Sequence, residues 1–262
     1  MKREGEKPLD YIPDDCGFTA IFRTIACVGD SLSSGEMEIL DANGEKSYHD
    51  LYEYSWGQYI ARATGSKVYN FSRGGMTAQE YMESWGEAND VWAHEKAAQA
   101  YIVAMGCNDI TRTLNGDCEW GCIADVKDDW KENAKSVYGW YAAMLQRYKQ
   151  IQPDAKFFLM TMPHIVGWSK EVTVYCEKQR DMLYDLADKF ENCYVLDFRR
   201  YAPVYDEEFA RCFMLNGHLN PAGYLLTGKM TGAYIDYIIR NNPGDFSEAA
   251  LIGTGLVNVK RQ

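Results

Sequence analysis

The sequence predicts an α/β protein whose parallel sheet is covered by helices on both faces. Five short apolar stretches have the length of buried strands, and segments with helical spacing of apolar residues separate them. Strands that alternate with helices in this way form a parallel sheet with right-handed crossovers. The predicted strands span residues 21–28, 67–71, 100–105, 156–160 and 194–196.

Residues typical of helix starts and helix ends occur between these strands. Residues 55–63 carry apolar side chains at helical spacing and are followed by the stop residue Gly65. Thr77 and Glu80 fit a capping box, which predicts a helix running through residue 82. Asn220 is the predicted N-cap of a final helix that begins at Pro221 and ends near residue 239. Further helices are predicted over residues 91–98, 128–150 and 171–190.

The remaining segments are predicted to be loops or terminal extensions. Residues 36–54 contain the turn signal Asp41-Ala42-Asn43-Gly44, and form either part of a substrate rim or a solvated loop. Loops are also expected over residues 111–126 and 199–217. We predict a single domain over residues 1–262, with a core at about 21–240, an N-terminal arm at 1–20 and a tail at 241–262.

Composition narrows the classes of partner. The 262 residues carry a formal net charge of −11, so the chain has no general attraction for nucleic acid or anionic lipid. No stretch reaches the roughly 18 apolar residues of a membrane span. The charged segment 1–15 lacks the apolar core of a signal peptide, which predicts a cytoplasmic protein, with a trimmed export signal as the alternative.

Cysteine spacing gives no metal site. Cys27, Cys107 and Cys193 lie in or beside apolar stretches and are predicted to be ordinary buried thiols. Cys118 and Cys122 are close in sequence, but neither a second close pair nor a nearby histidine accompanies them. Zinc is therefore not expected.

Polar groups follow three of the predicted strands at their carboxyl ends. Ser31 follows the first strand, the Gly74-Gly75 turn follows the second, and Asn108 follows the third. Parallel strands present their carboxyl ends at one edge of the sheet, where open α/β sheets bind ligands. Ser31 could be a nucleophile if a base lies within reach, or it could simply cap a helix.

His218 is the candidate base. It lies between Gly217 and the start of the final helix, which would fix its ring. Acyl transfer by serine also needs donors aimed at the developing oxyanion. The backbone N–H groups of Ser31 and Gly75 and the side-chain amide of Asn108 could supply them.

Four blocks resemble the SGNH (GDSL) hydrolase family in order and spacing, and together they extend from residue 25 to residue 224. The resemblance implies a three-layer α/β/α sandwich, a flavodoxin-like fold with a central five-stranded parallel sheet. It implies an esterase, lipase, thioesterase or carbohydrate deacetylase that needs no metal and no cofactor. It also implies Ser31 as nucleophile, Ser31, Gly75 and Asn108 as oxyanion donors, and His218 as general base. The blocks are Gly29-Asp30-Ser31-Leu32, the turn at Gly75, Gly106-Cys107-Asn108-Asp109 and His218-Leu219-Asn220.

One position departs from the family pattern. The family usually has an aspartate three residues before the histidine, and this position is Leu215. The sequence therefore leaves several arrangements open: a Ser–His dyad, orientation by a backbone carbonyl or by Asn216, or an acid from elsewhere. Asp197 and Asp206 are the nearest candidates in sequence for such an acid. An uncharged orienting group would hold the tautomer but stabilise the imidazolium less.

Other polar and aromatic side chains are candidates for the substrate rim. His164 follows the fourth strand and faces the same sheet edge, where either substrate contact or packing would suit it. Trp120 and Trp168 lie in predicted loops, where they could form a platform for a sugar ring or pack into the core. Asp30 and Asp109 are expected to hold turns through backbone N–H groups and to take no part in catalysis.

We therefore expect a serine esterase that cleaves a small-molecule ester through an acyl-enzyme on Ser31. The short acyl group, such as acetyl on a carbohydrate, is an analogy at the level of the fold. Two alternatives stay open. One is a non-catalytic carbohydrate-binding relative, motivated by Leu215 at the acid position. The other is an acyltransferase with the same residues.

Overall fold

The computed structural model describes residues 3–259 and has a parallel five-stranded sheet at its centre. The strand order is β4-β1-β5-β6-β7, and every pairing within this sheet is parallel. All five strands predicted from the sequence are confirmed with small changes at their ends. They are β1 (Thr24–Gly29), β4 (Lys67–Ser72), β5 (Ala100–Ala104), β6 (Lys156–Met160) and β7 (Cys193–Leu196).

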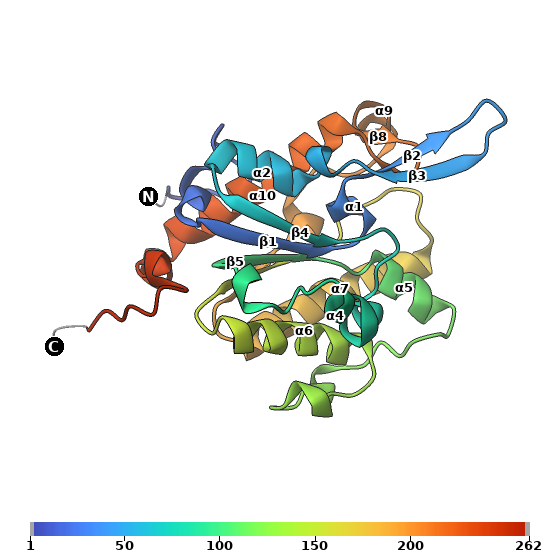
Figure 1. The fold of residues 1–262 in the computed structure, drawn as a ribbon. Coiled ribbons are helices and arrows are strands. Elements are labelled where there is room, and N and C mark those ends of the chain that lie inside the picture. The colour runs from blue at the N-terminus through green and yellow to red at the C-terminus, as the bar shows by residue number, and fades with distance from the viewer. Residues whose placement is uncertain (1–2, 260–262) are drawn as a thin grey trace.

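Helices cover both faces of the sheet and make a three-layer sandwich (Figure 1). Alternate strand residues belong to different core clusters: Ile25 packs with one layer, whereas Ala26 packs with the other. One face is covered by α2 (Trp56–Thr64) and α10 (Pro221–Asn241). The opposite face is covered by α6 (Val137–Ile151), α7 (Lys170–Lys189) and the helical stretch that begins with α3 (Ala78–Glu80), passes through η3 (Tyr81–Trp85) and ends with α4 (Gly86–Ala88).

The predicted caps of two helices are present. Thr77 accepts a hydrogen bond from the backbone N–H of Glu80 at the start of α3. Asn220 accepts one from Gly223, and Pro221 is the first residue of α10. Short segments complete the larger elements: η2 (Tyr52–Tyr54), η4 (His94–Lys96), η5 (Ile123–Asp125), α8 (Phe198–Tyr201) and α9 (Glu207–Phe213).

One predicted helix was wrong, and another begins later than predicted. The helix expected over residues 91–98 is replaced by a turn and η4, because Trp92 leaves the helical path to pack between Tyr81 and Tyr148. The helix expected over residues 128–150 begins only at Val137, after the cap Ser136. Asn133 is held in an irregular segment before it, since its amide binds Gln146, and η6 (Trp130–Glu132) lies there.

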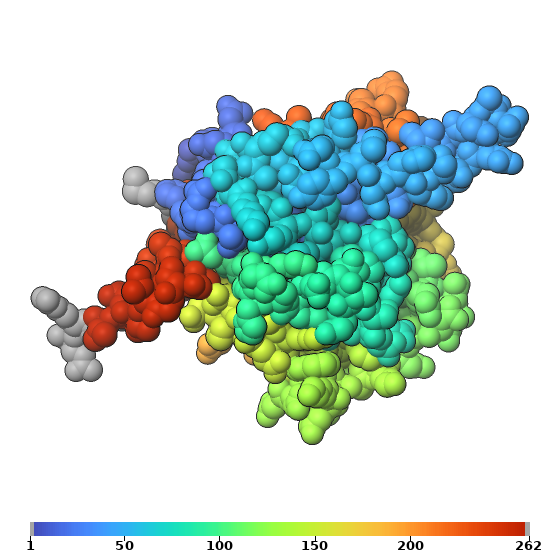
Figure 2. All heavy atoms as spheres, in the orientation of Figure 1, coloured from blue at the N-terminus to red at the C-terminus, as the bar shows by residue number. Residues whose placement is uncertain are grey.

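All three predicted loops contain regular structure, and the one expected over residues 199–217 holds α9 and most of α8. Residues 107–114 form α5 (Cys107–Leu114), directly after β5. Residues 36–50 form an antiparallel hairpin of β2 (Glu36–Leu40) and β3 (Lys46–Asp50). The predicted turn signal makes the hairpin tip, where the Asp41 carboxylate accepts hydrogen bonds from the backbone N–H groups of Asn43 and Glu45. The hairpin projects from the body of the molecule (Figure 2).

Both terminal segments pack on the sandwich. η1 (Gly17–Ile21) lies against α10, where the Thr19 hydroxyl donates to the Gly232 carbonyl. The C-terminal segment adds η7 (Pro243–Phe246) and η8 (Ala249–Leu251), and Phe246 packs on Phe158. Among residues 3–259, none of the helices combines the length and apolar character that crossing a membrane would need.

Candidate active site

The strand order fixes where a site can form. In a sheet with this order, the chain leaves β1 toward one face and β5 toward the other, which opens a crevice at their carboxyl ends. A cavity of about 800 Å³ lies in this crevice. Ser31, Gly75, Asn108 and His218, which the sequence predicted as catalytic and oxyanion residues, all line it.

A tight turn delivers Ser31 into the cavity. Gly29 ends β1 so close to β5 that a Cβ atom there would lie 2.7 Å from the Ala104 carbonyl oxygen. Asp30 is buried and accepts a 3.0 Å hydrogen bond from the backbone N–H of Leu32. It therefore caps α1 (Ser31–Ser34), as expected of a turn-holding residue. Burial raises the pKa of Asp30 to about 7.

The second and third blocks are joined to each other. Gly75 has φ +71°, lines the cavity and has open space around its Cβ position, so no side chain covers this part of the turn. The Asn108 amide donates to the Met76 carbonyl at 3.0 Å, which leaves its second N–H for a ligand. Asp109 accepts from the backbone N–H of Ala78 at 2.9 Å, and burial raises the pKa of Asp109 to about 6.

His218 is carried by a small hairpin. β8 (Met214–Leu215) pairs with β9 (His218–Leu219), and Leu215 lies directly opposite His218. The turn between them places Asn216 in the left-handed conformation, with φ +55°. Asn220 then caps α10, so the histidine is held between a tight turn and a helix start.

Two carboxylates from the larger hairpin flank the imidazole. Glu36 Oε1 lies 3.1 Å from His218 Nε2, and Glu38 Oε2 lies 3.5 Å from His218 Nδ1. The two glutamates are two residues apart on β2, so both side chains project from the same face of the strand. The Tyr48 ring of β3 meets the His218 ring edge to face at 5.8 Å.

The two carboxylates differ in their surroundings. Glu38 pairs with the Lys46 ammonium at 2.6 Å, and this contact is the main reason why the pKa of Glu38 is lowered. Burial raises the pKa of Glu36, with His218 acting in the opposite direction. Glu38 is therefore the more firmly ionised of the two.

The groups that the sequence offered for orienting His218 lie elsewhere. The Asn216 amide donates to the Glu38 carbonyl at 2.8 Å and so holds β2. Asp197 accepts hydrogen bonds from Thr161 and Tyr184. Asp206 lines the cavity but caps α9 by accepting from Phe209 N–H. Within residues 3–259, the carboxylates at ion-pair distance from the ring are those of Glu36 and Glu38.

Not all of the candidate rim residues lie in the cavity. Trp168 lines the cavity. Trp120 is only 8% exposed and packs edge to face on Tyr175, which matches the core alternative. His164 is exposed and its carbonyl accepts from Tyr205 N–H; in the part of the chain that the structure describes, neither His164 nor Trp120 lines the cavity.

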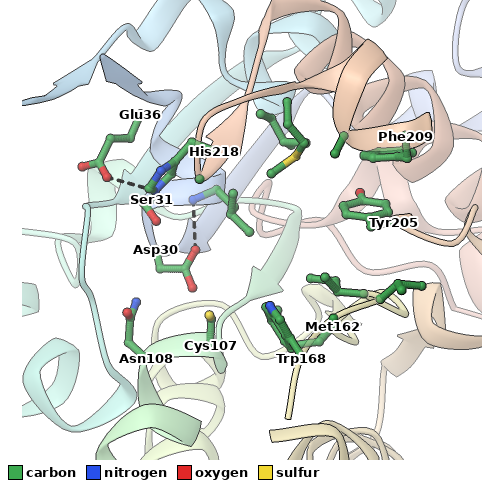
Figure 3. Close-up of a pocket in the computed structure, with 18 of the residues that line it drawn as sticks. Asp30, Ser31, Glu36, Cys107, Asn108, Met162, Trp168, Tyr205, Phe209 and His218 are labelled. Atoms are coloured by element: carbon green, nitrogen blue, oxygen red, sulfur yellow. Dashed lines mark hydrogen bonds and ion pairs between the residues drawn. The ribbon is translucent and has the colours of Figure 1, made fainter. Parts of the chain in front are cut away.

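The cavity has a polar end and an apolar wall (Figure 3). Asp30, Ser31, Glu36 and His218 gather at the polar end in this view, with Asn108 below them. The apolar wall includes a stacked pair of rings, Tyr205 and Phe209, whose centroids are 3.7 Å apart. Other apolar lining residues are Met162, Ile165, Val166, Trp168, Ala210, Met214 and Leu219.

Sequence reasoning missed Glu36 and Glu38. A usable signal was present: Glu36 and Glu38 alternate with Met37 and Ile39 immediately before the turn signal at 41–44. Such alternation before a turn is typical of a hairpin strand with one polar face. Nothing in that pattern, however, specifies that the polar face meets a histidine 180 residues later in the chain.

Comparison with known proteins gives the family and the fold. The model of the GDSL-like Lipase/Acylhydrolase family matches residues 27–226. A search of curated proteins found no match. Three similar solved structures show the same fold at low identity, and all three are esterases by name.

The first is a family two carbohydrate esterase from Clostridium thermocellum in complex with cellohexaose, 16% identical, with a TM-score of 0.57 over 92% of this chain and 66% of that chain. The second is a carbohydrate esterase family 2 enzyme with a carbohydrate-binding domain from Corynascus thermopiles, 15% identical, with a TM-score of 0.56 over 87% of this chain and 68% of that one. The third is the acetyl xylan esterase AlAXEase, 15% identical, with a TM-score of 0.50 over 79% of this chain and 97% of that chain.

Because the family model spans most of the sequence and includes all four site blocks, the chain belongs to the GDSL-like lipase/acylhydrolase family of hydrolases that act on ester bonds.

Proposed function

We propose that the protein is a serine esterase that removes a short acyl group, such as acetyl, from a carbohydrate. The observation that carries this proposal is the shared cavity: Ser31, Gly75, Asn108 and His218 come from four separate segments and line one space. A hydroxyl, an imidazole and amide donors at the carboxyl edge of the sheet are the groups that acyl transfer needs. The family match gives the same reaction class.

The first half of the reaction forms an acyl-enzyme. Ser31 Oγ attacks the ester carbonyl carbon while His218 Nε2 takes the hydroxyl proton. The carbonyl oxygen becomes an oxyanion that the Ser31 and Gly75 N–H groups and the Asn108 amide stabilise. The tetrahedral intermediate collapses, the ester C–O bond breaks, and the imidazolium gives its proton to the leaving alcohol.

The second half of the reaction hydrolyses the acyl-enzyme and regenerates the free enzyme. Water attacks the acyl carbon, His218 Nε2 takes the proton from that water, and the same donors stabilise the second oxyanion. The Ser31–acyl bond breaks and Ser31 Oγ recovers its proton from His218. All atoms balance as ester plus water to acid plus alcohol.

Two observations support a carbohydrate ester as substrate. The wall opposite Ser31 carries aromatic side chains, among them Trp168 and Tyr205, whose faces suit a sugar ring. Two of the similar structures are carbohydrate esterases and a third is an acetyl xylan esterase, although at 15–16% identity. The non-catalytic alternative was motivated by Leu215, and the nearby Glu38 carboxylate weakens that motive.

The test is hydrolysis of p-nitrophenyl acetate and of an acetylated sugar, with acid release followed by titration. Wild type is expected to turn over both, to prefer acetyl to octanoyl esters, and to lose at least about 10⁴-fold in kcat as Ser31→Ala. Ser33→Ala, in the same short helix but outside the cavity lining, is the matched control. Equal turnover by wild type and Ser31→Ala would contradict the proposal.

A further inference from the structure

The position that normally carries the acid of this family is apolar, yet the histidine is not without carboxylates. Leu215 lies opposite His218 in the β8–β9 pair, so an aspartate there would be within reach of the ring. Instead both ring nitrogens face acids of β2. A Ser–His–acid triad needs one acid to orient its histidine, and here two are present.

Glu38 has the setting of a fixed orienting group. Its side chain is only 4% exposed, and Lys46 neutralises it. A Cβ atom at Gly217 would lie 2.5 Å from its Oε2, so the residue next to His218 must be small for the carboxylate to approach. The carboxylate faces Nδ1, the nitrogen that does not exchange protons with serine in a Ser–His–acid triad.

Glu36 has a different setting. Its carboxylate lies at Nε2, the nitrogen that must accept the Ser31 proton. It also lies against the glycine turn, since a side chain at Gly74 would collide with Glu36 Oε2. A negative charge beside the base and against the glycine turn opposes the negative charge that develops on a nearby oxyanion.

Only one of the two acids has a fixed countercharge. Among residues 3–259, no lysine or arginine lies within ion-pair distance of Glu36, whereas Lys46 holds Glu38. The other titratable groups near the pair, among the described residues, are Tyr48 and Asp50 of β3, Asp30 before α1 and Tyr224 of α10. Asp50 is acidic and accepts from Ser34, so it repels Glu36 rather than holding it.

We propose that the two glutamates act on His218 in opposite senses: Glu38 positions the imidazole for proton transfer, and Glu36 occupies Nε2 in the free enzyme until substrate displaces it. This inference rests on the proposed function of Ser31 and His218. Glu38 is a positioning residue: its carboxylate lies 3.5 Å from the buried Nδ1, which has no hydrogen-bond partner among the described residues, and it would accept from Nδ1–H and stabilise the imidazolium during the reaction. Glu36 accepts from Nε2–H of the protonated ring, so Nε2 cannot take the Ser31 proton until its own proton has left, and Glu36 thereby restrains the free enzyme.

The test compares Glu36→Gln with Glu38→Gln, the same isosteric change two residues apart. We measure the rate of Ser31 phosphonylation by a fluorophosphonate between pH 5 and 9, and kcat and KM for p-nitrophenyl acetate. Glu38→Gln is expected to lower the phosphonylation rate and kcat by roughly 10²-fold or more, with little change in KM. Glu36→Gln is expected to raise the rate by up to about tenfold below neutral pH and to move the acidic limb of the profile to lower pH.

Two further variants separate positioning from folding. Glu45→Gln, an exposed acid of the same hairpin, is expected to behave as wild type. Leu215→Asp is expected to restore at least part of the activity of Glu38→Gln, because it returns an acid to the residue opposite His218. In proton NMR, a downfield Nδ1–H signal is expected in wild type and in Ser31→Ala, and is expected to be lost in Glu38→Gln.

The outcomes are distinguishable. If phosphonylation depends on Ser31 but both glutamine variants lose or keep the rate equally, the opposite roles are wrong while the proposed function stands. If wild type and Ser31→Ala are equally unreactive, the proposed function fails and this inference fails with it. Circular dichroism checks that each variant is folded.

Discussion

The sheet edge and the β2–β3 hairpin bring polar groups to the same cavity but are held in place by different forces. Ser31 and Asn108 follow strands whose side chains are buried on both faces. The hairpin projects from the body, and all residues of β3 are exposed. Near the site it is attached by one buried apolar side chain, Met37, and by polar contacts, among them Asn216 to the Glu38 carbonyl and Tyr224 to the Glu36 carbonyl.

The two halves of the site can therefore be changed separately. Packing at the sheet edge determines where the nucleophile and the oxyanion donors lie, and it is coupled to global stability. The contacts of the hairpin determine how His218 is charged and oriented, and a change there leaves the core intact. Variants at the sheet edge should therefore affect folding or the transition state strongly, whereas variants in the hairpin should modulate the base.

After the loss of Ser31 itself, the largest expected effect concerns the oxyanion donor of the sheet edge. Asn108→Ala removes the amide whose second N–H is available to a ligand. We expect kcat for p-nitrophenyl acetate to fall by about 10²–10³-fold, the typical cost of losing one such donor. Asn115→Ala, at the exposed end of the same helix, should leave kcat near the wild-type value. A loss below threefold for Asn108→Ala would remove it from the oxyanion hole.

A matched pair of glycine variants tests the two kinds of support directly. At Gly29 a Cβ would lie 2.7 Å from the Ala104 carbonyl oxygen, so Gly29→Ala should cost about 1–3 kcal/mol through overpacking. At Gly44, in the hairpin tip, nothing lies near the Cβ position and only the strain of φ +80° remains. Gly44→Ala should cost about 1 kcal/mol. Urea denaturation measures both, and equal costs would break the contrast.

Asp30 gives the sheet edge a pH-dependent stability. Burial raises the pKa of Asp30 to about 7, whereas an unfolded chain releases this proton near pH 4. The folded state therefore binds more protons in this window, and the free energy of unfolding falls as pH rises through it. Asp30→Asn keeps an acceptor for Leu32 N–H and should reduce this fall, on the order of 1–2 kcal/mol between pH 4.5 and 7.5. Denaturation curves with the same pH dependence for both proteins would contradict the assignment.

The smallest effect is expected from the hairpin countercharge. Lys46 is more than half exposed, with a side-chain exposure of 56%, so solvent screens its pairing with Glu38. Lys46→Met should lower kcat/KM by about two- to fivefold while the urea midpoint changes little. A loss as large as that of Glu38→Gln would mean that Lys46, rather than the carboxylate, controls the histidine.

The predictable part of the molecule is the part built from local patterns. Buried strands and their glycine-marked ends are visible as apolar runs, so Ser31 and Asn108 could be assigned to one sheet edge. The false helix over 91–98 arose because Trp92 has helical spacing but packs between rings from other elements.

The acids at His218 were beyond such patterns for a similar reason. Glu36 and Glu38 meet His218 only through contact between two hairpins that are far apart in sequence, and the candidates Asp197 and Asp206 serve as helix caps instead. The family pattern showed that Leu215 stands where an aspartate is usual, but it could not indicate which distant strand would supply a carboxylate.

The most direct test of an activated Ser31 is the intact mass of the protein after exposure to a fluorophosphonate. Wild type should gain one phosphonyl group, and peptide mapping should locate it on Ser31, while Ser31→Ala gains none. A folded wild-type protein that stays unmodified, or one that is modified to the same extent as Ser31→Ala, would contradict the account.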